Sequence, residues 1–106
     1  MAWVLLTLAG LLEIIFALAM KYSEGFTRLT PSVITVVAGL SSVVLLSFSL
    51  RSLPVGTGYA VWTGIGAAGT ALLGMIVLGE STALLRIFCI ALILAGVLGL
   101  KLVSGN

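Results

Sequence analysis

Four long apolar stretches, joined by short polar connections, account for nearly all of this sequence. They cover about residues 2–20, 31–50, 57–78 and 83–103, and a helix needs about 20 mostly apolar residues to cross the hydrocarbon of a bilayer. Only 8% of the 106 residues are charged, against roughly 25% in an ordinary soluble domain. The sequence therefore predicts an all-α, multi-pass membrane protein in which residues 1–106 form a single four-helix transmembrane domain. It leaves no room for a soluble or nucleotide-binding domain.

The few basic residues and the single cysteine argue against nucleic-acid binding and against a soft-metal site. The basic residues lie singly near the expected ends of the apolar stretches, which is typical of membrane helices and gives no patch for nucleic acid; they are Lys21, Arg28, Arg51, Arg86 and Lys101. The single cysteine, Cys89, lies in the fourth stretch, where we expect a small core residue. With one cysteine and no histidine, the sequence offers no soft-metal site, and we expect neither a metal nor another cofactor.

One acidic residue, Glu13, interrupts the first apolar stretch. An acidic side chain at the centre of a bilayer costs about 2.5–3.5 kcal/mol even on lenient insertion scales, so its presence there indicates a functional site. Gly10 and Ala17 lie one helical turn on either side of it, and Phe16 flanks it. Small residues at this spacing serve either a close helix contact or a cavity. The competing interpretation is a protonated carboxyl that only joins neighbouring helices by a hydrogen bond.

Three hydroxyl residues recur at seven-residue spacing in the second stretch. For Thr35 and Ser49 we expect a bond to the carbonyl four residues earlier in the same helix. Ser42 lies in mid-span at a depth comparable to that of Glu13, where a donor to the carboxylate is most useful. We therefore expect Ser42 to belong to the site.

The third stretch places Tyr59 and Trp62 on one helix face, followed by several glycines. Aromatic residues near a helix start often anchor it at the membrane interface, which is an adequate interpretation of Tyr59, but Trp62 lies about one turn deeper. Gly64 and Gly66 lower the local helix stability and permit a bend. They predict a hinge, and thin packing without motion is the alternative.

The fourth stretch has no candidate catalytic group in its apolar body. It carries small residues at four-residue spacing, a moderately specific signal for helix association; they are Ala91, Ala95 and Gly99, with Gly96 beside them. This pattern predicts the helix that forms a dimer.

Lysine and arginine are almost evenly divided between the two expected sides of the membrane. One side holds Arg51 and Lys101, and the other holds Lys21, Arg28 and Arg86. Because an excess of these residues sets the orientation of a membrane protein, the balance allows copies to insert both ways round. Four helices are too few to enclose a substrate path and also keep Glu13 from lipid. We therefore predict an antiparallel, dual-topology homodimer in which two such carboxyls share one cavity.

Several motifs resemble those of the small multidrug resistance family of bacterial proton-coupled exporters, over essentially the whole chain. They are Gly10-x-x-Glu13, the segment 20–28, Pro54-x-Gly56-x-x-Tyr59-Ala60-x-Trp62-x-Gly64-x-Gly66 and Ala95-Gly96-Val97. Within the family, the chain resembles the guanidinium-exporter subtype on Gly10, Ser42, the run 62–67, Gly79-Glu80-Ser81 and Gly99-Leu100-Lys101. That subtype usually has Trp at the position of Phe16, and Phe cannot donate an indole N–H to the carboxylate.

The resemblance implies a transporter rather than an enzyme, located in the bacterial inner membrane as an antiparallel homodimer. It would export guanidinium and small substituted guanidinium cations in exchange for protons, with both competing for the paired Glu13 carboxylates. Ser42 and Trp62 would orient Glu13 by hydrogen bonds, and Tyr59 would close the cavity or contact the substrate. The full set of cavity residues that it implies is Gly10, Phe16, Ser42, Tyr59 and Trp62.

Two alternatives stay open at this point. A polyspecific exporter of quaternary ammonium compounds and other drug cations would use the same mechanism. The lost donor at Phe16 favours it, whereas Ser42 and Gly10 count against it. A non-transporting membrane assembly subunit would use Glu13 only as a structural link.

Overall fold

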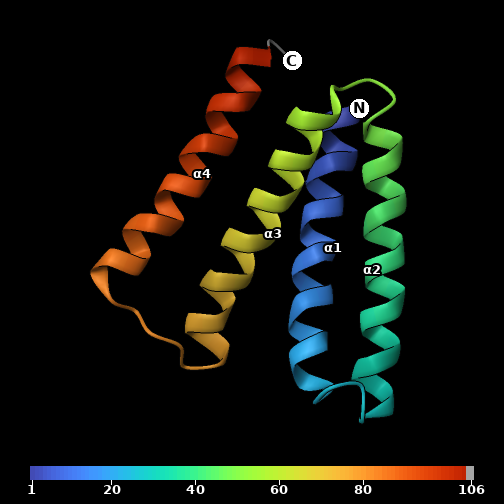
Figure 1. Ribbon diagram of the computed structural model, residues 1–106, viewed down its shortest axis with the longest axis vertical. Helices are drawn as coiled ribbons and strands as arrows, with labels where there is room; N and C mark the ends of the chain where they lie inside the picture. Colours follow the sequence, from blue (N-terminus) through green and yellow to red (C-terminus); the bar gives the residue numbers. More distant parts are fainter. Residues whose placement is uncertain (105–106) are drawn as a thin grey trace.

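The computed structural model describes residues 1–104 as four helices joined by short connections (Figure 1). The helices are α1 (Ala2–Tyr22), α2 (Leu29–Ser49), α3 (Val55–Val77) and α4 (Leu84–Ser104). All four are long and apolar enough to cross a membrane. The start of α1, the α2–α3 connection and the end of α4 lie at one end of the molecule, and the other two connections lie at the opposite end. The expected all-helical architecture with four membrane spans is confirmed.

Two helices begin earlier than their apolar stretches suggested. α2 begins at Leu29 rather than at residue 31, so Pro31 is the third residue of its first turn. A proline is tolerated there because the first N–H groups of a helix have no partner within the helix. α3 begins at Val55, directly after Pro54, rather than at residue 57. Local backbone chemistry, rather than the edge of the apolar stretch, sets these two ends.

The α1–α2 connection is held by the buried side chain of Ser23. Its hydroxyl donates a hydrogen bond to the carbonyl of Met20 at 2.7 Å and accepts one from the N–H of Phe26 at 3.1 Å. Residues 24–26 all have a positive φ, between 50° and 75°, which reverses the chain within a few residues. The turn therefore returns α2 alongside α1, where the two helices pack together.

The core of the protein lies between α1, α2 and α3. α1 is the central helix, because it packs against both of the others. The main cluster of buried apolar side chains comes from these three helices and the α2–α3 connection; it consists of Leu6, Ala9, Leu46, Leu53, Val61 and Trp62. This core fixes how the middle of α1, with Glu13, faces α2 and α3.

α4 is arranged differently. Its backbone approaches α3 and no other helix within residues 1–104, and Figure 1 shows it diverging from α1 and α2. At its far end the Lys101 ammonium lies over the Trp3 ring of α1, 5.0 Å from the ring centroid. Cys89 is exposed on α4. The expectation that Cys89 is a core residue is therefore wrong within the described chain, because α4 presents most of its surface away from the other helices.

Candidate functional site

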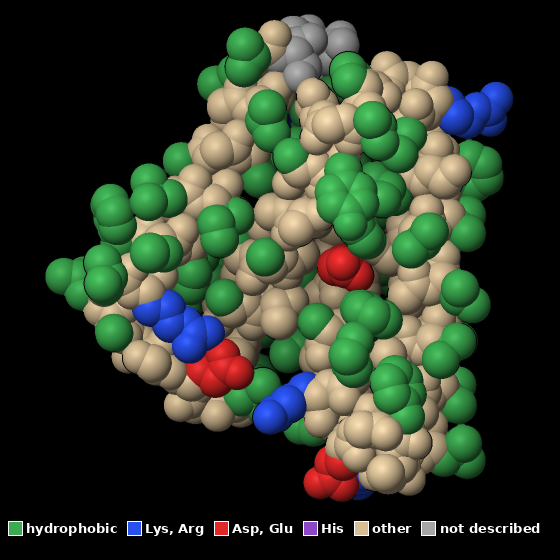
Figure 2. All heavy atoms as spheres, viewed as in Figure 1, with side chains coloured by type: hydrophobic (Ala, Val, Ile, Leu, Met, Phe, Trp, Pro, Cys, Tyr) green, Lys and Arg blue, Asp and Glu red, His purple; other side chains and the backbone are tan. Residues whose placement is uncertain are grey.

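Glu13 lies near the middle of α1 between two cavities. One cavity, of about 430 Å³, lies on the α3 side, and the other, of about 380 Å³, lies on the α2 side; both are lined by Glu13 and Phe16. Figure 2 shows an acidic side chain near the centre of one face of the molecule, among hydrophobic groups. Within residues 1–104, no group donates a hydrogen bond to the Glu13 carboxylate. The carboxylate is thus placed where a proton or a small cation can reach it from the cavities.

Gly66 of α3 makes the space that Glu13 occupies. A Cβ atom at residue 66 would lie 2.5 Å from the Cγ of Glu13, far inside van der Waals contact. The stem of the glutamate therefore rests directly against the α3 backbone. Any larger residue at position 66 has to displace Glu13 or separate α1 from α3.

Gly10, one turn before Glu13, serves a close contact between helices, which is one of the two uses expected of small residues. A Cβ atom there would lie 2.6 Å from the Cγ2 of Ile65, so Gly10 allows a close contact between α1 and α3. Ala17, one turn after Glu13, lines the cavity on the α3 side. The sequence left the choice between contact and cavity open, and the structure assigns one use to each side of the carboxylate.

Ser42 and Trp62 form a buried chain of hydrogen bonds that ends on the backbone of α1. The indole Nε1 of Trp62 donates to Ser42 Oγ at 2.9 Å, and Ser42 Oγ donates to the carbonyl of Ala9 at 2.6 Å. In an α-helix this carbonyl also accepts the N–H of residue 13. The two side chains therefore hold the backbone turn that leads to Glu13.

The expectation that Ser42 and Trp62 bond the Glu13 carboxylate itself is wrong for this conformation. Each side chain has a single polar hydrogen, and the Ala9 carbonyl and the Ser42 hydroxyl use them. Thr35 and Ser49 behave as expected, because each donates to the carbonyl four residues earlier, at 2.7 and 3.0 Å.

Two aromatic side chains close the α2 side of the site. Phe16 packs its ring on Gly39 of α2, where a Cβ atom would lie 2.7 Å from the ring. Trp62 lines the same cavity as Glu13 and Phe16. Tyr59 packs edge-on against Trp62, with ring centroids 5.2 Å apart and an angle of 64° between the planes. Tyr59 is more than half exposed and does not line either cavity, so its contact with substrate stays a prediction.

The glycines and alanines of α3 and α4 differ in what surrounds them. Gly64 packs against Val97 of α4. Because α3 is one uninterrupted helix, the hinge at Gly64 and Gly66 stays a prediction. Along α4, a Cβ atom at Gly96 or Gly99 would meet no heavy atom within 4 Å. Ala91 and Ala95 are exposed. The small-residue stripe is therefore accessible in the part of the chain that the structure describes.

The sequence reasoning missed two residues that share a cavity with Glu13. Glu80 and Arg86, from the α3–α4 connection and the start of α4, line the cavity on the α3 side. The available signal was on α3, where Thr63, Ala67 and Thr70 share one helix face and all line this cavity. This face of α3 begins beside Glu13 and continues to Gly74, on which the Glu80 carboxylate rests.

The comparison with known families agrees with this geometry. The model of the Small Multidrug Resistance protein family matches residues 1–93. The chain belongs to the small multidrug resistance family. Among small multidrug resistance proteins it is similar to a "Guanidinium exporter" of Yersinia pestis, at 62% identity over 104 residues, which are 98% of this chain and 100% of the relative.

Further relatives extend this similarity within the small multidrug resistance family. A "Guanidinium exporter" of Citrobacter freundii is 55% identical over 102 residues, which are 96% of this chain and 97% of the relative. One of Proteus vulgaris is 54% identical over 104 residues, which are 98% and 100% of the two chains. The similarity therefore extends over nearly the whole length of the chain.

Proposed function

We propose that this small multidrug resistance protein is a proton-coupled antiporter that exports guanidinium and small substituted guanidinium cations across the bacterial inner membrane. It is a transporter and not an enzyme. The observation that supports this most is the Glu13 carboxylate, which lies between two cavities in the middle of a membrane helix. The names of the relatives, which are similar over nearly the full chain, supply the class of cargo.

The chemistry of one carboxylate is sufficient to couple the two fluxes. Guanidinium is planar, and its parallel N–H groups match the two oxygens of a carboxylate. A protonated carboxyl cannot hold the cation in this way, so a proton and a cargo ion compete for Glu13. Because each one displaces the other, export of the cation accompanies entry of protons without a separate proton relay.

The working unit is an antiparallel homodimer with two Glu13 side chains in a shared site. The accessible small-residue stripe of α4 supports an association between copies. In an antiparallel pair, the inward-open and outward-open states are the same structure with the two protomers exchanged. Bending of α3 at Gly64 and Gly66 accompanies that exchange in this proposal.

A second cargo class has one observation in its favour. The cavity on the α2 side is lined mainly by apolar groups, including Phe16, Phe26, Val36 and Val43. A quaternary ammonium ion is a bulky, apolar cation without N–H donors, and it suits such a cavity. Export of quaternary ammonium compounds by the same mechanism is therefore the alternative to test beside guanidinium.

Glu13→Gln in proteoliposomes tests the proposal. A glutamine keeps the shape of the side chain but neither releases a proton nor carries a charge. We expect uptake of guanidinium driven by a pH gradient to fall to the level of empty liposomes, while the wild type concentrates guanidinium in preference to tetraethylammonium. Glu24→Gln in the α1–α2 connection removes an equal charge away from both cavities and is the matched control. Full transport by Glu13→Gln would exclude the mechanism.

A further inference from the structure

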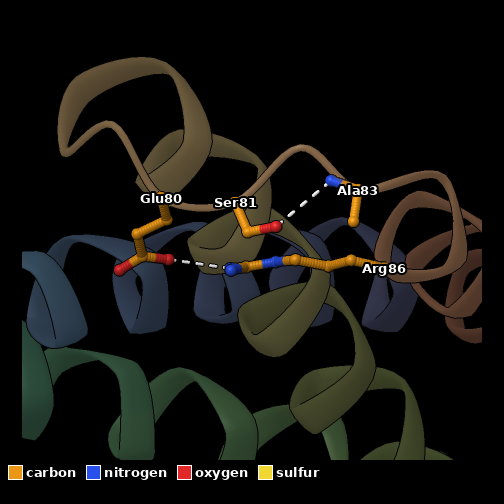
Figure 3. Close-up of polar contacts among 4 residues, drawn as sticks. All are labelled: Glu80, Ser81, Ala83 and Arg86. Carbon is orange, nitrogen blue, oxygen red and sulfur yellow. Dashed lines mark hydrogen bonds and ion pairs between the residues drawn. The ribbon is translucent and has the colours of Figure 1, made fainter.

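A second carboxylate, that of Glu80, lines the cavity on the α3 side together with Glu13 and Arg86. Figure 3 shows Glu80 in the α3–α4 connection and Arg86 in the first turn of α4, with their head groups directed toward each other. Glu80 Oε1 and Arg86 Nη2 lie 2.7 Å apart, and the two side chains are 42% and 33% exposed. The ion pair therefore stands where the cavity meets the surface.

The backbone of α3 fixes the position of Glu80. Its carboxylate rests on Gly74, where a Cβ atom would lie 2.5 Å from Oε1. The N–H of Glu80 donates a hydrogen bond to the carbonyl of Gly74 at 3.2 Å. Gly79, with a φ of 67°, supplies the left-handed turn that folds the chain back over the end of the helix. Glu80 is thus held over the last turns of α3.

The two carboxylates lie at different depths along one wall of the cavity. Gly66 touches Glu13, and Gly74 touches Glu80. These glycines are eight residues apart on α3, and a rise of 1.5 Å per residue places them about 12 Å apart along the axis. Thr70 lines the wall between them. A small cation leaving Glu13 toward this end of the molecule passes a hydroxyl and then reaches Glu80.

Arg86 presents on Glu80 the same chemical group as the proposed cargo. Its head group is a guanidinium, and it is bound to a carboxylate at the mouth of the cavity. We propose that Glu80 is a second binding site for guanidinium cations, at which the cargo displaces the Arg86 side chain on its way to or from Glu13. This inference rests on the proposed function, because it takes guanidinium as the cargo.

The attachment of Arg86 is weak enough to be exchanged. Exposed ion pairs contribute little to stability, because water screens them and ordering two long side chains costs entropy. Arg86 also lies in the first turn of α4, where the positive end of the helix dipole disfavours a cation. A free guanidinium ion has no side chain to order when it binds the Glu80 carboxylate. In an antiparallel dimer, one Glu80 stands on each side of the membrane.

The proposal predicts opposite effects for the two members of the pair. Glu80→Gln removes the site, so the KM for guanidinium rises by about threefold, the size expected for one exposed ion pair. Arg86→Gln removes the internal competitor, so the KM falls by a similar factor. If the pair only ties the connection to α4, both variants remove the same tie and shift KM in the same direction.

Initial rates of guanidinium uptake into proteoliposomes at several concentrations give these KM values. Glu24→Gln is again the matched control, because it removes a carboxylate from the connection at the same end of the molecule but outside the cavity lining. Equal shifts in Glu24→Gln and Glu80→Gln would assign the effect to general surface charge. If the wild type transports guanidinium and neither Glu80→Gln nor Arg86→Gln changes the KM, the Glu80 site is overturned and the proposed function stays intact.

A binding measurement keeps the test independent of transport. Guanidinium chloride is titrated into the Glu13→Gln/Arg86→Gln variant in detergent, with sodium chloride as the ionic-strength control, while backbone amide resonances are followed by NMR. We expect saturable shifts at residues 79–81 that disappear when Glu80→Gln is added. The same linear drift with both salts would overturn the site, whatever the transport assay shows.

Discussion

The interface of α1 with α2 and α3 and the free face of α4 use the same kind of residue in opposite ways. At the interface, the space left by each glycine is filled from a neighbouring helix: Gly10 by Ile65, Gly39 by Phe16 and Gly66 by Glu13. On α4, Gly96 and Gly99 face open space. A small residue in a membrane helix thus marks a place for a neighbour, and only the structure shows whether the same chain supplies it.

Apolar character does not distinguish the two regions. α1 and α4 have the same mean hydropathy, yet 28% of the most apolar segment of α1 is buried, against only 6% of the most apolar segment of α4. In a bilayer the lipid tails are as apolar as leucine, so an exposed apolar helix face carries no penalty comparable to that in water. Packing, and not hydropathy, therefore separates the helices that build the site from the helix that is available for association.

The largest expected effect concerns the free face of α4. Residue 94 is the midpoint of α4, so in two antiparallel copies that cross there, Cys89 lies level with residue 99 of the other copy. Two Cys89 thiols then lie about 15 Å apart along the axis, from ten residues at 1.5 Å each. With a bismaleimide shorter than this, we expect no cross-linked dimer from the wild type and a dominant one from Gly99→Cys.

The cross-linking pattern separates all three arrangements of α4. A parallel dimer gives cross-links in both proteins, because equivalent residues then lie at the same level. A chain that does not associate through α4 gives them in neither. Either result would exclude an antiparallel dimer that crosses at the middle of α4.

The next effect concerns a filled glycine against an open one on the same helix. Gly66→Ala forces a methyl group into the Glu13 stem, and overpacking of this kind costs about 1–3 kcal/mol. Because it moves the carboxylate, we expect guanidinium uptake to be lost as well. Gly56→Ala adds the same methyl where nothing lies within 4 Å, so it is expected to leave uptake unchanged. Thermal unfolding in detergent and uptake rates measure both, and a silent Gly66→Ala would contradict the contact.

The smallest effect concerns two serines of α2. Ser42→Ala leaves the indole N–H of Trp62 without its acceptor, which costs about 1–2 kcal/mol for a buried donor. Ser49→Ala removes a bond within one helix, to a carbonyl that already accepts a backbone N–H, and is expected to be nearly neutral. Thermal unfolding of the two variants makes the comparison. Equal stabilities would show that the chain from Trp62 to Ala9 does not hold the helices together.

The sequence predicted the depth of Ser42 and Trp62 correctly and their hydrogen-bond partner incorrectly. Depth follows from counting residues along helices of known rise. The partner depends on how far each helix is rotated and on which of several nearby acceptors is closest, and these are set by core packing. The same packing seats Phe16 on Gly39 and places Tyr59 behind Trp62. The hydrogen bonds and the contact between Phe16 and Gly39 join different helices, so no spacing along one helix reveals them, whereas Tyr59 and Trp62 both lie on α3.

By itself the sequence determined four membrane spans and a costly carboxylate at Glu13. Both follow from the bilayer, which requires about 20 apolar residues for each helix and makes any acidic side chain expensive. Only the tertiary structure decided which small residues are filled, and that Glu80 shares a cavity with Glu13. Those facts depend on contacts between residues far apart in the chain. Close packing and the left-handed turn at Gly79, rather than composition, bring these residues together.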